Sequence, residues 1–153
     1  MKTIQSISVV EDVTLVSLHD TPADFGVVAE IFRQLSDAGV DVDMISQTPP
    51  HRNAPDISFT VSGEDMGKVV AVSAALRAQH PEMKLSVSGG HSKISVFSEA
   101  MRGCPGVAGR VFAAVAEAKA DVVMITTSEV DISLLVEKSD MENTIAAIEK
   151  AFA

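Results

Sequence analysis

The chain has 153 residues, of which 46% are hydrophobic and 22% are charged, the composition of a folded globular protein rather than a disordered one. Its formal net charge of −9 repels phosphate backbones and anionic bilayers at long range, which argues against nucleic acid and membrane partners. The single cysteine, Cys104, permits no internal disulfide, and no apolar run reaches the ~18 residues that cross a bilayer. We therefore expect a cytoplasmic protein.

Hydrophobic periodicity predicts a series of strands and helices in the first half of the chain. Apolar residues at i, i+3, i+4 and i+7 indicate helices, and strict alternation with polar residues indicates strands. Gly39 follows the first helical run, where a left-handed C-cap residue belongs. After an initial strand at 3–10, the patterns predict a strand at 13–18, a helix at 28–35, strands at 40–47 and 57–62, a helix at 66–73 and a strand at 84–88. The order after residue 12 is βαββαβ, which is ferredoxin-like.

The second half predicts the same order but lacks its last strand. The final helix opens with Ser139-x-x-Glu142, a pattern typical of a capping box. The chain ends soon after Phe152, so no fourth strand can follow that helix. The predicted elements are a strand at 94–98, a helix at 108–115, strands at 121–127 and 130–136, and the final helix.

The two halves are also similar in sequence. Residues 25–32 align with 105–112 at an offset of 80, whereas 56–58 align with 131–133 at an offset of 75. The first copy therefore has five extra residues in the proline-rich segment 48–55. Internal repetition of this kind indicates two copies of one supersecondary unit.

The initial strand supplies what the second copy lacks. An uncovered sheet edge is a liability, and Ile7 and Val9 alternate with serines as an edge strand does. We therefore expect residues 3–10 to complete the second sheet. The fold class is then α+β, with two antiparallel sheets and a first domain, 11–90, inserted in a second formed by 3–10 and 91–153.

Three other features of the sequence do not predict a functional site. The glycines in 103–109 imitate a dinucleotide fingerprint, but their spacing is wrong and the two strands that follow have no crossover helix between them. The four histidines have neither helical i+4 partners nor a second cysteine, so we expect no metal and no cofactor. The sequence indicates no general base beside Cys104, so we interpret this residue as a small residue in a tight loop.

The loops that lead into the first helix of each copy offer a possible binding site. A helix N-terminus has free N–H donors that suit a carboxylate. Asp20 lies on the first of these loops, and Ser46 and Gln47 end the next strand, so together they could hold an ammonium group and a side chain. Asp24 is more simply read as a helix-terminal charge.

Residues 101–112 and 124–133, together with 40–47 and 56–61, resemble the paired ACT domains at the regulatory end of aspartokinases. The resemblance covers almost the whole chain and includes no kinase part. It implies binding of an end-product amino acid, most often lysine or threonine, at interfaces between ACT domains. By motif, the implied ligand-binding residues are Asp20, Gly26, Val27, Asp43 and Gln47 with Asp121, and in the second copy Met101, Gly106, Val107, Thr126, Thr127, Ser128 and Glu129.

The same resemblance implies a regulatory protein that is not itself an enzyme. We expect a homodimer that binds an amino acid and regulates a partner. Two alternatives remain open: an excised fragment or separate regulatory subunit of an aspartate kinase, and an assembly module without ligand. The chain departs from the family pattern at Pro22–Gly26, where three residues are inserted, and at Lys119 and Val123, which replace the first copy's Gly39 and Asp43.

Overall fold

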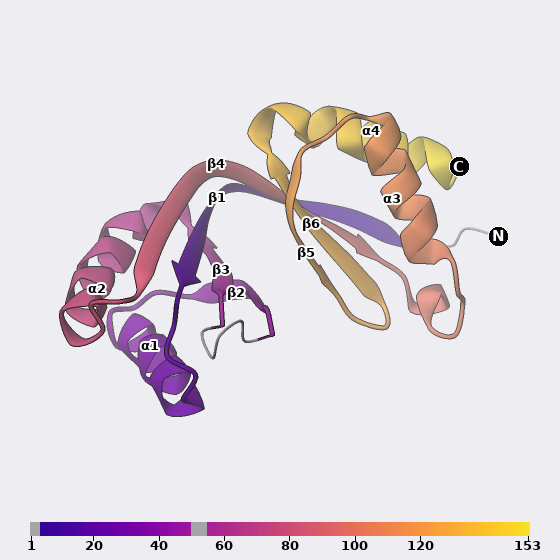
Figure 1. The fold of residues 1–153 in the computed structure, drawn as a ribbon. Helices are drawn as coiled ribbons and strands as arrows, with labels where there is room; N and C mark the ends of the chain where they lie inside the picture. The colour runs from indigo at the N-terminus through magenta and orange to yellow at the C-terminus, as the bar shows by residue number, and fades with distance from the viewer. Residues whose placement is uncertain (1–3, 50–54) are drawn as a thin grey trace. The chain divides into compact units, whose positions relative to one another are not determined.

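The computed structural model describes residues 4–49 and 55–153. These residues form two compact units (Figure 1). The first unit is the described part of Asp12–Gly89, and the second unit is Gly90–Ala153 with the described part of Met1–Glu11. The chain thus leaves the second unit near its start and returns to it at Gly90, as the inserted arrangement requires.

The first unit is an antiparallel sheet with two helices packed on it. β3 pairs with β1 from Val13↔Ser62 to Leu18↔Ile57, and on its other side with β2. The core lies between sheet and helices, and there the rings of Phe32 and Phe59 meet edge to face at 5.4 Å. The elements are β1 (Ser6–His19), α1 (Phe25–Asp37), β2 (Val42–Gln47), β3 (Ile57–Ser62), α2 (Met66–Gln79) and β4 (Lys84–Phe97), with β1 and β4 continuing into the second unit.

The second unit repeats this arrangement. β6 pairs antiparallel with β4 and with β5, and the helices contribute Val111, Val115 and Ile148 to a separate core. The N–H of Gln5 donates to the carbonyl of Phe97 at 2.9 Å, and Ile7 packs against this core. The N-terminal strand therefore completes the second sheet, as predicted. The remaining elements are α3 (Val107–Glu117), β5 (Val122–Thr127), β6 (Asp131–Glu137) and α4 (Met141–Ala151).

The expectation of separate strands at 3–10 and 13–18, and at 84–88 and 94–98, is corrected. β1 and β4 are each continuous over 14 residues. Asp12 in β1 and Gly90 in β4 have positive φ angles of 53° and 77°, and they mark where each strand passes between units. A single left-handed residue redirects a strand without ending it, and aspartate and glycine tolerate that conformation best.

Two predictions about helix ends have opposite outcomes. Gly39 and Lys119 both adopt the left-handed conformation after the first helix of each copy, at φ 78° and 55°, as the repeat predicts. The capping box at Ser139 and Glu142 is wrong, because α4 begins at Met141 and its N-cap Asp140 makes no side-chain capping bond. Ser139 lies instead in the short 3₁₀ turn Lys138–Asp140 that precedes the helix.

Candidate functional site

The loop between β4 and α3 forms one wall of a cavity of about 340 Å³ in the second unit. The opposite wall is the turn between β5 and β6. Six of the seven residues predicted for the second copy line this cavity: Met101, Gly106, Val107, Thr127, Ser128 and Glu129. Thr126, the seventh, lies on β5 and is half-buried outside the lining.

The first turn of α3 opens toward this cavity without a side-chain cap. Gly106 is the N-cap residue, and its φ of 95° is a conformation that favours glycine. As a glycine, Gly106 makes no side-chain capping bond to the first turn, while Val107 and Ala108 line the cavity. The first N–H groups of a helix have no intrahelical acceptor and carry the positive end of the helix dipole. This end of the cavity is therefore suited to a carboxylate.

The buried residues of the cavity lining are apolar. They are Met101, Val107 and Ile132, with exposures of only 8%, 7% and 3%. All three belong to the core of the second unit, so their positions are fixed by packing. Sequence reasoning missed Ile132, because its alternation with polar neighbours indicates a core strand position and nothing more.

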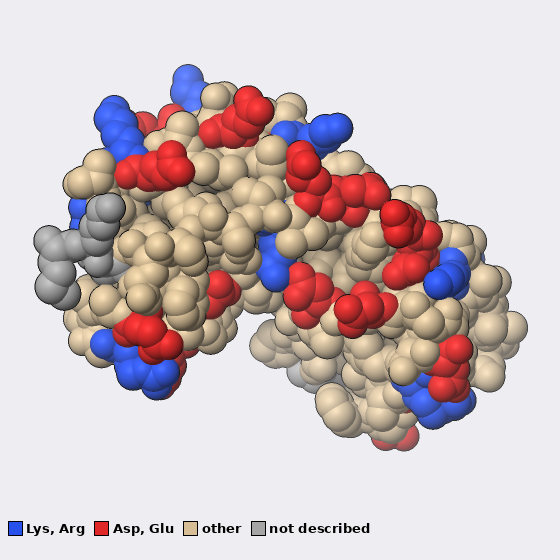
Figure 2. All heavy atoms as spheres, turned by 180° about the vertical axis from the view of Figure 1, so that it is seen from behind, with Lys and Arg blue, Asp and Glu red and all other residues tan. Residues whose placement is uncertain are grey.

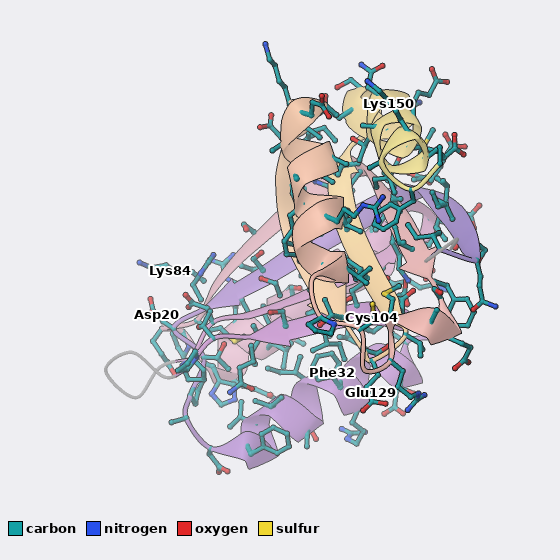
Figure 3. The ribbon with its side chains drawn as sticks, turned by 90° about the vertical axis from the view of Figure 1, so that its right-hand side faces the viewer. Asp20, Phe32, Lys84, Cys104, Glu129 and Lys150 are labelled. Carbon is teal, nitrogen blue, oxygen red and sulfur yellow. The ribbon has the colours of Figure 1, made fainter. Side chains whose placement is uncertain are left out.

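The mouth of the cavity carries its charged side chains. The Arg102 guanidinium forms an ion pair with the Glu129 carboxylate, which joins the β4–α3 loop to the β5–β6 turn. The Ser98 N–H also donates to the Val130 carbonyl at 2.9 Å and holds the same two segments together. Figure 3 shows Cys104 and Glu129 at this end of the second unit. No local sequence pattern indicates this ion pair, because its partners are 27 residues apart.

The equivalent loop of the first unit is arranged differently. Asp24 is the N-cap of α1, and its carboxylate accepts a hydrogen bond from the Gly26 N–H at 2.8 Å. The Val27 N–H donates to the Asp24 carbonyl at 2.9 Å. The two N–H groups expected to meet a ligand carboxylate thus have acceptors within their own turn. The interpretation of Asp24 as a helix-terminal residue is confirmed.

The other residues predicted for the first copy are distributed over several elements. Asp20 has a φ of 56°, and its carboxylate lies 3.9 Å from the Lys84 ammonium. Figure 3 labels both residues. Asp43 and Gln47 are exposed on β2. Asp121 belongs to the second unit, where its backbone N–H donates to Asp140 at 3.0 Å. The second-copy residues therefore gather around a cavity, whereas of the first-copy residues only Gly26 and Val27 belong to the capped first turn of α1.

The comparisons with known proteins agree with this repeated fold. A family model described as an ACT domain matches residues 20–75 and 94–152, which is most of both copies. The chain belongs to the ACT-domain family. The expected resemblance to the regulatory region of aspartokinases is also confirmed by the relatives and solved structures below.

Curated relatives of this ACT-domain chain are complete aspartate kinases. An aspartate kinase of Stutzerimonas stutzeri is 33% identical over 139 residues, which is 91% of this chain and 33% of that protein. Aspartokinase 2 of Bacillus subtilis is 28% identical over 149 residues, or 97% of this chain and 36% of that protein. The chain therefore spans about a third of the length of the curated relatives it matches.

Solved structures include proteins of the same length. The regulatory subunit of aspartate kinase from Thermus thermophilus, in a ligand-free form, superimposes with a TM-score of 0.89 at 27% identity, covering 99% of this chain and 100% of that one. The regulatory subunit from Thermus flavus gives a TM-score of 0.90 at 26% identity, with the same coverage. The chain is thus an ACT regulatory region like that of aspartate kinase. None of its described helices is both long and apolar enough to cross a membrane.

Proposed function

We propose that this chain is a cytoplasmic regulatory module that binds an amino-acid effector in the second unit and transmits its presence to a catalytic partner. One observation supports the proposal above all: the residues carried over from the family motif surround a cavity beside an uncapped helix N-terminus. Lysine and threonine are the effectors that the family resemblance favours.

The binding mode follows from the chemistry of the two walls. The effector's α-carboxylate accepts hydrogen bonds from the first N–H groups of α3 at Val107 and Ala108. Its α-ammonium lies toward the β5–β6 turn, where the Glu129 carboxylate and the Thr127 and Ser128 hydroxyls are acceptors. A zwitterion satisfies both walls at once, which neither a simple anion nor a simple cation does.

A site in the first unit, made of Asp20, Gly26, Val27, Asp43 and Gln47, remains a second proposal. An effector there competes with Asp24 for the Gly26 N–H. We therefore place the principal site in the second unit.

The partner we propose is a catalytic chain of the aspartate-kinase class. The relatives matched over a third of their length are aspartate kinases, and two solved structures of the same length are regulatory subunits of aspartate kinase. A separate regulatory subunit and an excised fragment of such a kinase both remain alternatives. We also propose a homodimer, because among the residues that the structure describes the β1–β3 pairing covers only Val13–Leu18 and leaves one side of the N-terminal part of β1, with exposed Val9 and Val10, open to another strand.

Thermal unfolding in the presence of each of the twenty amino acids tests the proposed function. An effector at 100 times its dissociation constant stabilises the folded chain by about 2.7 kcal/mol, so at least one amino acid is expected to raise Tm. Glu129→Ala should reduce that rise, because it removes the acceptor for the ammonium group. Glu117→Ala, an exposed glutamate at the other end of α3, serves as the control. If no amino acid raises Tm, the assembly-module alternative takes its place.

A further inference from the structure

The effector cavity is lined by exposed polar side chains and by buried apolar side chains. Its described polar side chains, Arg102, Thr127, Ser128 and Glu129, are all exposed. The buried lining consists of Met101, Val107 and Ile132, which are also part of the hydrophobic core. A ligand side chain that enters beyond the mouth therefore leaves water for contact with hydrocarbon and a thioether.

The charges at the mouth already have partners. Arg102 forms its ion pair with Glu129, and its other terminal nitrogen lies 4.0 Å from Glu99. Once the ligand's α-ammonium faces Glu129, a cationic side chain finds no second carboxylate, because Glu129 is the only acidic residue in the described lining of this cavity. A ligand hydroxyl that reaches Met101, Val107 and Ile132 loses its hydrogen bonds to water and gains none from those three side chains.

We propose that this cavity selects amino acids with an apolar side chain, of the leucine or methionine type, over lysine and threonine. The inference rests on the proposed function, since it concerns the side chain of an effector whose carboxylate and ammonium are held as described above. The cavity volume of about 340 Å³ is near the lower end of the ~300–1,000 Å³ typical of ligand sites, which suits a single amino acid.

The size of the preference follows from the buried hydrocarbon. Each methylene group that leaves water is worth roughly a factor of four in affinity. Leucine and methionine each bury about three more carbon or sulfur groups than alanine, so an advantage of roughly tenfold or more over alanine is expected. Methionine has the further advantage that its flexible thioether adapts to the irregular surface beside Met101.

Isothermal titration calorimetry on the full chain measures this preference directly, with L-leucine, L-methionine, L-alanine, L-threonine and L-lysine titrated separately. Cys104 reports the location, because it is exposed and lines the cavity. A ligand bound there should slow the alkylation of Cys104 by iodoacetamide. The expected result is at least tenfold tighter binding of leucine or methionine than of threonine or lysine, with protection of Cys104.

Val107→Thr tests the apolar lining with a side chain of nearly the same shape. It should weaken leucine or methionine binding about tenfold or more, because a hydroxyl then faces the ligand's hydrocarbon. Val115→Thr is the matched control: it is on the same helix, is 5% exposed compared with 7% for Val107, and lies in the same core but outside the cavity lining. Both variants lose some stability, but only Val107→Thr should change the affinity.

The possible results distinguish failure of the apolar selectivity from failure of the proposed function. Lysine or threonine binding as tightly as leucine and methionine, with protection of Cys104, overturns the apolar selectivity and leaves the effector site in place. Unchanged leucine and methionine affinity in a folded Val107→Thr variant also overturns it. If none of the five amino acids gives heat or protects Cys104 while another amino acid raises Tm, the selectivity alone fails. Failure of all twenty removes the proposed function as well.

Discussion

At the scale of single residues, two copies of one motif have diverged at the helix N-terminus. Asp24 caps α1 with its own carboxylate, whereas Gly106 leaves the first turn of α3 without a side-chain cap. An N-cap carboxylate typically stabilises a helix by about 0.5–2 kcal/mol, so the first copy gains stability where the second keeps its donors available for a ligand. The sequence predicted both loops, and it predicted Asp24 as a helix-terminal residue.

The Asp12 carboxylate lies against Gly63, and mutation can test this contact. A Cβ added at Gly63 would lie 2.2 Å from an oxygen of the Asp12 carboxylate, so Gly63→Ala forces that side chain to move. We expect Gly63→Ala to lower the free energy of unfolding by about 1 kcal/mol, at the low end of the cost of overpacking, because the side chain that moves is short. The cost should shrink when Asp12→Gly is added, since the obstructing carboxylate is then gone. Urea unfolding of both single variants and the double variant measures this coupling.

The control for this cycle is Gly67→Ala. Gly67 lies in α2, and a Cβ added there meets nothing within 4 Å. Replacing an unobstructed helical glycine by alanine should raise stability by about 0.5–1 kcal/mol. Two results would contradict this interpretation. One is that Gly63→Ala stabilises the protein as much as Gly67→Ala does. The other is that Asp12→Gly leaves the stability loss caused by Gly63→Ala unchanged.

At the scale of elements, α1 carries a network of ion pairs on its exposed face. Arg33 donates two hydrogen bonds to Glu30, at 2.6 and 2.9 Å, and Gln34 donates a third at 3.0 Å. The Arg33 hydrogen bonds, aided by Gln34, lower the pKa of Glu30 from 4.5 to about 2. α3 lacks this network, since Arg110 stands where α1 has Glu30 and instead donates to the Ala151 carbonyl at 2.5 Å.

The lowered pKa of Glu30 predicts a dependence of stability on pH. A carboxyl group whose pKa is lower in the folded state contributes stability above its unfolded pKa and loses it as pH falls through the folded pKa. The contribution of Glu30 should therefore be present above pH 4.5 and disappear between 4.5 and about 2. Urea unfolding of the wild type and Glu30→Gln across pH 2–6 should show a stability difference that narrows as pH falls. A difference that does not change with pH contradicts the assignment.

The elements also show what sequence patterns cannot specify. Alternation located both halves of β1 and β4, but the continuity of each strand depends on one left-handed residue, Asp12 or Gly90, that periodicity does not detect. The prediction of a capping box was wrong for a related reason. The turn Lys138–Asp140 moved the start of α4 to Met141, and a one-residue shift of the N-cap, to Asp140, removes Ser139 from that position.

At the scale of the whole molecule, the repeat was predictable because both copies keep their core positions at fixed offsets. Composition predicted the acidic surface, since 21 Asp and Glu residues outnumber 12 Lys and Arg residues, and Figure 2 shows acidic side chains across the face it presents. The family resemblance also located half of the cavity lining of the second unit, six of its twelve residues. The pairing of Arg102 with Glu129 and the buried position of Ile132 required the structure, because neither leaves a local pattern.

The central claim is that the second unit binds an amino acid between the β4–α3 loop and the β5–β6 turn. Backbone amide chemical shifts of the ¹⁵N-labelled chain, followed by NMR during separate titrations with L-leucine, L-methionine, L-threonine and L-lysine, test it most directly. We expect saturable shifts for at least one of these amino acids, or for another amino acid that raises Tm, concentrated at residues 101–108 and 127–129. Shifts confined to residues 12–89, or no saturable shift with any of these amino acids, would contradict the proposed site.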